Sequence, residues 1–312
     1  MTACSFDLIE DSAFPLPPSC KSGWPWTKGS KPLPATMRNG KPWPKISIVT
    51  PSFNQGQYLE ETIRSVLLQN YPNLEYIIMD GGSTDNSVEI IKKYQPWLTY
   101  WVSEKDNGQA DAIYRGFEKS SGEIICWINS DDYYLPDAFF IAVKALLRHA
   151  GKNLVIGSSY HIDSKRELLY KYYGFPQKFE SLLVSGMYFS QPACFFSRDA
   201  FFKIDGFDRR LRFSFDYDLF LRLTNLSSPA YTRHPLAVFR RHDASKSMTI
   251  ADVAIKENRE IRLRYGLHDG LKIQKKLENS HRHIQTYKYI GKMLDIVSDP
   301  KWLIRRWVAW SP

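Results

Sequence analysis

The chain has 312 residues, 43% hydrophobic and 24% charged, a balance typical of a soluble globular protein with a sizeable core. Its formal charge of +9 favours anionic partners such as nucleotide diphosphates or anionic lipid surfaces. Because neither zinc-finger spacing nor an RNA-binding aromatic motif occurs, nucleic acid is not expected as a partner.

The cysteines and the apolar runs indicate the compartment. The four cysteines show no CxxC spacing, and Cys126 and Cys194 lie in apolar runs typical of reduced core thiols. The N-terminus carries acids and no continuous apolar stretch, so no signal peptide is predicted. No run of about 18 uncharged apolar residues predicts a membrane-spanning helix. A cytoplasmic protein is expected, with peripheral attachment to the inner face of the cell membrane as an open question.

Residues 1–44 are rich in Pro, Gly, Ser and Lys, with Trp24, Trp26 and Trp43 interspersed. Prolines at this density exclude helices and central strands. We therefore predict an extended arm that its tryptophans hold against the domain.

Residues 45–247 alternate between apolar strand patterns and helical patterns. Such alternation predicts an α/β domain with a parallel or mixed sheet covered on both faces. Ligands of these sheets bind beyond the carboxyl ends of the strands. The predicted strands are 45–52, 74–80, 98–104, 123–132 and 154–163, and the helices are 58–69, 86–94, 109–120 and 136–150, the last opening with Pro136.

Residues 248–312 are predicted to form a C-terminal helical extension, with helices at 251–266 and 271–294. The basic aromatic segment 301–310 combines three tryptophans with three cationic residues and no acid. Such a segment either lies at an anionic membrane interface or packs on the domain or on a second copy of the chain.

Polar residues follow the first three strands. Small side chains and free N–H groups at 50–56 can bind a nucleotide, although an ordinary capping turn explains them equally. Asp80, followed by two glycines, can accept hydrogen bonds from a base or a ribose, while Ser83 or Asp85 can cap the next helix. Acids and a lysine around Gly108 suit either a ribose and diphosphate site or a solvated loop.

The fourth strand is the most informative, because it runs into Asn129-Ser130-Asp131-Asp132. Two ionised carboxylates at the edge of a buried strand repel each other and lose solvation, so they need a cation. A divalent ion would offset both costs and leave positions for diphosphate oxygens. The alternative is a water-facing loop in which one acid caps a helix.

Two further polar clusters lie downstream. Asp216 stands at the first turn of a predicted helix among aromatic residues, where it acts either as a general base or as a helix-capping charge. Basic and hydroxyl residues at 240–247 can stabilise a diphosphate, and His242 can bind a metal. A solvated edge strand is the alternative.

Taken in order, these motifs resemble the family 2 glycosyltransferases, inverting enzymes of the GT-A fold. The resemblance covers about two-thirds of the chain. The matching segments are TPSFNQGQYLEETIRSVLLQNYPNLEYIIMDGGSTD (50–85), EKDNGQADAIYRGF (104–117), WINSDDYYLPDAF (127–139), QPACFFSRDAF (191–201), GFD (206–208), FDYDLFLRL (215–223) and RRHDASKS (240–247).

The resemblance implies a nucleotide-diphosphate sugar donor, a sugar or lipid-linked acceptor, and Mn²⁺ or Mg²⁺ as cofactor. It implies polysaccharide or glycolipid biosynthesis, by direct displacement at the anomeric carbon. It also implies that the domain at 45–247 has a nucleotide-binding part, 45–135, and an acceptor part, 136–247. The implied site comprises a nucleotide set (Pro51, Ser52, Asn54, Asp80, Ser83, Asp106, Gly108, Asp111, Asp131), a diphosphate set (Arg240, Arg241, Ser245), metal ligands (Asp131, Asp132, His242) and a catalytic base, Asp216 or Asp218.

Two departures from the family pattern matter. Asn129 stands where many members have Asp, and Phe215 occupies the common Glu position, which leaves the choice between Asp216 and Asp218 open. A sugar-phosphate nucleotidyltransferase would also suit an α/β sheet, but its glycine-rich GxGTR-like loop is absent. A non-catalytic sugar- or nucleotide-binding module is the third class, which the acids at 131, 132 and 216 disfavour.

Overall fold

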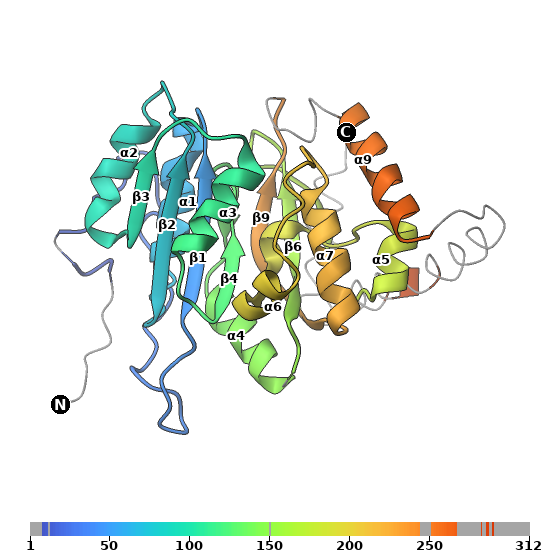
Figure 1. Cartoon of the computed structure of the whole chain (residues 1–312). Coiled ribbons are helices and arrows are strands. Elements are labelled where there is room, and N and C mark those ends of the chain that lie inside the picture. The colour runs from blue at the N-terminus through green and yellow to red at the C-terminus, as the bar shows by residue number, and fades with distance from the viewer. Residues whose placement is uncertain are drawn as a thin grey trace, which may run out of the picture.

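The computed structural model describes residues 8–11, 13–149, 151–243 and 251–266, together with residues 282, 285, 286 and 289. These residues form one mixed, mainly parallel sheet flanked by helices (Figure 1), as the sequence predicts. The strands are β1 (Ile46–Ser52), β2 (Leu74–Asp80), β3 (Tyr100–Ser103), β4 (Ile124–Trp127), β5 (Tyr133–Tyr134), β6 (Leu154–Ile162), β7 (Leu168–Tyr172), β8 (Cys194–Ser197) and β9 (Ala230–Arg240). The helices are α1 (Gly56–Leu67), α2 (Ser87–Tyr94), α3 (Gln109–Lys119), α4 (Ala138–Arg148), α5 (Phe179–Ser185), α6 (Arg198–Lys203), α7 (Phe215–Leu226) and α9 (Ala251–Arg264).

The strand order is β3-β2-β1-β4-β8-β6-β9-β5, and β7 pairs with β6 outside this path. Strands β3, β2, β1 and β4 pair in parallel in this order, whereas β8 runs antiparallel to both β4 and β6. Parallel pairing brings the carboxyl ends of β1, β2, β3 and β4 to one edge of the sheet. The loops that follow these strands therefore meet there.

Two apolar clusters cover the two faces of the sheet. Successive residues of a strand point to opposite faces, so Ile48 of β1 belongs to one cluster and its neighbour Val49 to the other. Residues of α1, α2 and α4 pack in the cluster with Ile48, and residues of α3, α5, α6 and α7 pack in the cluster with Val49. Gly116 of α3 allows this packing to be close, because a Cβ there would lie 2.5 Å from Val49 Cγ1.

Among the predicted boundaries that differ from the structure, two have a clear local cause. The fourth strand ends at Trp127 instead of continuing to 132, because the chain turns at Asn129, whose carbonyl accepts a hydrogen bond from Asp132 N–H. The helix predicted from Pro136 begins at Ala138, since Asp137 has a left-handed backbone conformation with φ of 62° that a helix cannot contain.

The N-terminal arm is held as predicted. Its described part contains no helix or strand beyond an isolated bridge between Thr36 and Pro42. The indole of Trp24 donates to Tyr134 O at 2.8 Å, and Trp26 and Trp43 are buried. Backbone carbonyls of the arm also accept hydrogen bonds from Arg64 of α1. This buried guanidinium donates to the carbonyls of Pro15, Pro25 and Trp26.

Other surface and core features bear on the predictions. Cys126 and Cys194 are buried free thiols, and burial raises the pKa of Cys126 to about 12. Within the described residues, no helix is long and apolar enough to cross a bilayer.

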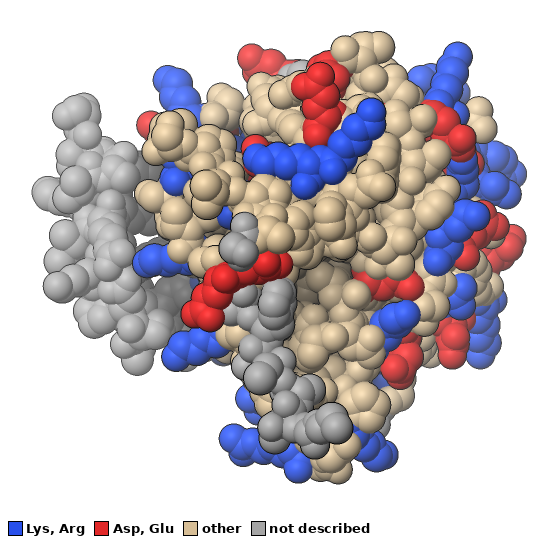
Figure 2. Space-filling model, turned by 90° about the vertical axis from the view of Figure 1, so that its left-hand side faces the viewer, with Lys and Arg blue, Asp and Glu red and all other residues tan. Residues whose placement is uncertain are grey.

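On the face that Figure 2 shows, basic and acidic side chains are interspersed, so the net charge does not mark one binding surface there. The basic segment 301–310 and the predicted helix at 271–294 lie outside the described residues, apart from the four single positions.

Candidate active site

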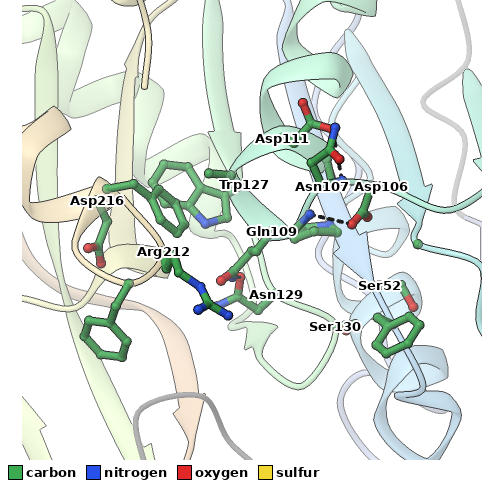
Figure 3. Close-up of a pocket in the computed structure, with 18 of the residues that line it drawn as sticks. Ser52, Asp106, Asn107, Gln109, Asp111, Trp127, Asn129, Ser130, Arg212 and Asp216 are labelled. Atoms are coloured by element: carbon green, nitrogen blue, oxygen red, sulfur yellow. Dashed lines mark hydrogen bonds between the residues drawn. The ribbon is translucent and has the colours of Figure 1, made fainter. Parts of the chain in front are cut away.

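A cavity of about 1220 Å³ opens at the carboxyl ends of β1, β2 and β4, between the start of α3 and the loop before α7 (Figure 3). Of the residues predicted for the site, those that line the cavity are Pro51, Ser52, Asp106, Gly108, Asp111, Asp131 and Asp216. Those that lie outside its lining are Asn54, Asp80, Ser83, Asp132, Asp218, Arg240, Arg241 and His242. Ser245 is not among the described residues.

The loops after β1 and β2 are tied to each other by side chains. Asn54 has a φ of 51°, its N–H donates to Ser83 Oγ at 2.8 Å, and its Oδ1 accepts from Thr84 N at 2.8 Å. Asp85 accepts from Gly56 N at 2.8 Å and thereby joins the second loop to the start of α1. Asn54, Ser83 and Asp85 therefore shape this wall of the cavity.

Asp80 lies beneath the cavity and is 2% exposed. It accepts hydrogen bonds from the N–H groups of Gly82 and Ser83 and from the hydroxyls of Ser83 and Ser103. Asp80 therefore organises the glycine loop from outside the cavity lining.

The wall above Asp80 combines a carboxylate, glycines and an exposed ring. Asp106 Oδ1 accepts from Gly108 N at 2.8 Å, and Asp106 Oδ2 lies 2.7 Å from where a Cβ of Gly81 would stand. Any side chain at Gly81 would thus displace the carboxylate. Phe53 also lines this part of the cavity and is 61% exposed, an unusual degree for a phenylalanine beside a cavity.

The two carboxylates after β4 have different environments. Asp131 lines the cavity, and its Oδ2 lies 3.0 Å from His242 Nε2, whose ring packs on Tyr58. Asp132 is 1% exposed and accepts from Arg240 N at 2.8 Å. Burial, and secondly the charge of Asp131, hold the pKa of Asp132 well above its ordinary value. Of the two acids, only Asp131 lines the cavity.

Arg240 supports this acidic turn from behind. Its guanidinium is buried, donates to Asp131 O at 2.9 Å, and pairs with Glu61 at 2.8 Å. The hydroxyl of Thr62 donates to the carbonyls of Ser130 and Asp132. Arg240 therefore holds the turn in place from outside the cavity lining.

We expect Arg240→Gln to lower the free energy of unfolding by about 3–5 kcal/mol, because it leaves Glu61 buried with less compensation. Urea unfolding followed by circular dichroism measures the change. Arg148→Gln, at an exposed arginine in the last turn of α4, is the control. Equal stability of the two variants would contradict a supporting role for Arg240.

The two acids of α7 also differ. Asp216, in the first turn, lines the cavity, and its Oδ1 accepts from Tyr217 N at 2.7 Å. Asp218 is fully buried and pairs with Arg222 at 2.7 Å and Arg264 at 3.4 Å. Of these two acids, only Asp216 therefore meets the cavity.

Three cations line the cavity: one lysine, whose loop the sequence indicated as a possible ribose and diphosphate site, and two arginines that the prediction did not assign to the site. Arg209 and Arg212 come from the loop before α7, and Lys105 comes from the loop after β3. Figure 3 shows Arg212 and Asp216 on one side of the cavity and Ser52 and Asp106 on the other. Local sequence offered little indication, since Arg209, Arg210 and Arg212 are neighbours and only some face inward.

Three polar atoms of the lining are buried without a hydrogen-bond partner among the described residues: Ser52 Oγ, Gln55 Oε1 and Gln191 Oε1. The other end of Gln191 donates to Trp127 O at 2.8 Å, which fixes its orientation. Buried polar atoms are ordinarily paired, so such atoms in a cavity wall indicate a polar ligand.

Comparisons with known proteins agree with this geometry. The sequence profile described as Glycosyl transferase family 2 matches residues 47–212. An uncharacterized glycosyltransferase of Rickettsia typhi is 29% identical over 216 residues, which cover 65% of this chain and 66% of the relative, just under two-thirds of its length. An uncharacterized glycosyltransferase of Mycobacterium tuberculosis is 31% identical over 204 residues, 62% of this chain and 74% of the relative. Chondroitin synthase of Pasteurella multocida is 29% identical over 184 residues, 58% of this chain but 19% of the synthase.

Solved structures show the same fold at low sequence identity. S. aureus TarS 1-349 in complex with UDP has a TM-score of 0.59 and 16% identity, covering 83% of this chain and 78% of that chain. The mannosyltransferase PcManGT of Pyrobaculum calidifontis, in complex with GDP-Man and Mn²⁺, has a TM-score of 0.54 and 16% identity, covering 85% of this chain and 79% of that chain. The arrangement of strands and helices is that of the GT-A fold. With the family profile matching more than half of its residues, the chain belongs to glycosyl transferase family 2.

Proposed function

We propose that this chain transfers a sugar from a nucleotide-diphosphate sugar to an acceptor hydroxyl, with Asp216 as general base and with inversion at the anomeric carbon. The observation that carries the proposal is the position of Asp216, whose carboxylate lines the same cavity as the strand-end loops, across from Ser52 and Asp106 (Figure 3). Family membership and the bound UDP and GDP-Man of the two structural neighbours support a nucleotide-sugar donor.

The nucleoside occupies the end of the cavity formed by the loops after β1, β2 and β3. Phe53 offers an exposed ring for a base, Asp106 offers a carboxylate, and Ser52 offers a hydroxyl without an internal partner. The glycines at 81 and 82 allow a ligand to approach the backbone closely. Asp111 and Gly108 lie next to this end, at the start of α3.

The residues near the acidic turn fit a divalent ion such as Mn²⁺ or Mg²⁺. Asp131 supplies a carboxylate at the cavity wall, and the adjacent His242 supplies an imidazole. No group of three or more His, Cys, Asp or Glu side chains able to hold a metal occurs in the described part of the chain. A site with few protein ligands suits an ion that also binds substrate phosphates. When bound, the ion would supply positive charge for the leaving diphosphate.

The chemistry of the chain's own residues follows from this placement. Asp216 accepts the proton of the acceptor hydroxyl as the acceptor oxygen bonds to the anomeric carbon. The bond from that carbon to the diphosphate oxygen breaks in the same step, and the nucleotide diphosphate leaves with the electron pair. Lys105, Arg209 and Arg212 place positive charge along the cavity, which stabilises the departing anion.

Incubation with a panel of nucleotide sugars and divalent ions, followed by mass spectrometry, tests the proposal. We expect either transfer to a sugar acceptor or slow hydrolysis of one donor, with release of a nucleoside diphosphate. Formation of a nucleotide sugar from a sugar phosphate and a nucleoside triphosphate would instead identify a nucleotidyltransferase. Binding of a nucleotide sugar with no turnover across acceptors would favour a non-catalytic module.

The acceptor side of the proposal rests on sequence. We propose a sugar or lipid-linked acceptor in polysaccharide or glycolipid biosynthesis, presented at an anionic membrane surface that segment 301–310 contacts. We expect the full chain to float with anionic vesicles and not with neutral ones, and deletion after Pro300 to abolish flotation. Indifference to lipid charge and to the deletion would contradict membrane contact. A concentration-dependent mass in solution would instead support packing of the tail in a homodimer.

A further inference from the structure

The loop that carries Arg212 and leads to Asp216 is anchored by a carboxylate from the C-terminal extension. Glu257 of α9 accepts hydrogen bonds from three consecutive backbone N–H groups: Arg212 at 2.7 Å, Phe213 at 2.9 Å and Ser214 at 2.8 Å. Glu257 is 8% exposed, so these bonds are largely shielded from water. They join positions 43 to 45 residues apart in the chain.

The three N–H groups immediately precede α7, which begins at Phe215. Consecutive N–H groups at a helix N-terminus form a binding site for an anion. In this chain the anion is the Glu257 side chain, so the extension itself occupies that site. The loop between Asp208 and α7 therefore has its orientation set by α9.

Two further residues of α9 attach it to the domain. Ile261, one helical turn after Glu257, is fully buried in the apolar cluster with α7. Arg264 pairs with Asp208 at 3.0 Å and with Asp218 at 3.4 Å. Figure 1 shows α9 on the side of the molecule where α7 and α5 lie. Helix α9 therefore contacts both the loop before α7 and α7 itself.

Two charged residues of the cavity lie at or within two positions of these anchored N–H groups. Arg212 donates its own N–H to Glu257 while its side chain lines the cavity, and Asp216 follows two residues after Ser214. Tyr217, the residue after Asp216, contacts α5, because its hydroxyl donates to Leu182 O or Leu183 O. A shift at 212–214 would therefore move the cation and the base together.

We propose that Glu257 is a positioning residue of the active site, which sets the placement of Arg212 and Asp216 from outside the cavity. The inference rests on the proposed function in one respect, namely that Asp216 acts in the transfer step. It extends the active site to α9, beyond the 47–212 segment that the family profile matches.

Glu257→Gln tests the proposal, with Glu260→Gln as the matched control because Glu260 lies exposed on the same helix. Gln keeps the size of the side chain but replaces one acceptor oxygen by a donor and removes the charge. Hydrogen exchange of the full chain is the first measurement. We expect the amides of 212–214 to exchange about tenfold or more faster in Glu257→Gln, because charged hydrogen bonds are lost, with the sheet unchanged.

Kinetics with the active donor are the second measurement. We expect kcat of Glu257→Gln to fall by about tenfold or more while the affinity for UDP or GDP stays within about threefold, since the nucleoside end lies on other loops. Exchange and kcat equal to those of Glu260→Gln would overturn the proposal. A fall in melting temperature accompanied by parallel losses of kcat and nucleotide affinity would also overturn it, because that pattern indicates a general structural role. A wild-type protein without any turnover would contradict the proposed function, while the exchange measurement would still test the anchor.

Discussion

Replacing Asp216 by Asn is expected to lower kcat by about 10²- to 10⁴-fold, the usual contribution of a general base. Asn keeps the shape of the side chain but cannot accept the proton of the acceptor hydroxyl. The affinity for UDP or GDP should stay within about threefold, because the base acts in the chemical step and the nucleoside binds at the other end of the cavity. Steady-state kinetics and calorimetry measure the two quantities.

Asp218→Asn provides the matched comparison on the same helix. Asp218 is fully buried and pairs with Arg222 and Arg264. Its replacement should therefore lower the free energy of unfolding by about 3 kcal/mol, because two guanidinium groups lose their carboxylate. In the folded variant, turnover should survive. Near-normal turnover of Asp216→Asn, together with inactivity of folded Asp218→Asn, would move the base to Asp218.

Replacing Asp131 by Asn is expected to weaken nucleotide binding in Mn²⁺ by about tenfold or more, because the metal loses its carboxylate ligand. In EDTA the wild type and the variant should bind UDP or GDP with the same weak affinity. Calorimetry with each nucleotide, with and without Mn²⁺, measures this difference. Transfer should fall in parallel with the lost affinity.

Asp137→Asn is the control for this experiment. Asp137 is an exposed acid near the same turn, and its φ of 62° is one that Asn tolerates well. Its replacement should leave metal-dependent binding unchanged. If the wild type bound nucleotides equally well in EDTA and in Mn²⁺, Asp131 would have no metal to hold and the divalent cofactor would be ruled out for donor binding.

The chain's local patterns determined the architecture. Apolar runs of strand length alternate with helical spacing from Lys45 onward, and these periodicities depend only on residues near in sequence. They were sufficient to predict the mainly parallel sheet, its covered faces and a site at the strand ends. The boundaries at Trp127 and Ala138 escaped prediction, because a turn and one left-handed residue decided them.

The roles of neighbouring polar residues depended on the tertiary structure. Asp131 and Asp132 are adjacent in sequence, yet one lines the cavity and the other is buried against Arg240, which comes from the far end of the domain. Likewise, Asp216 lines the cavity, whereas Asp218, two residues later, is fully buried. Side chains one or two residues apart point in different directions, and no composition or spacing rule states which of them meets water and which meets another segment.

The contact of Glu257 with residues 212–214 shows the physical reason. Glu257 lies in a helix rich in charged residues, where the sequence predicts a solvent-exposed side chain like that of its neighbour Glu260. Its partners are backbone N–H groups, which every residue except proline carries, so no side chain in the sequence identifies them. Only the packing of α9 on α7 brings that carboxylate to the N-terminus of the helix that carries Asp216.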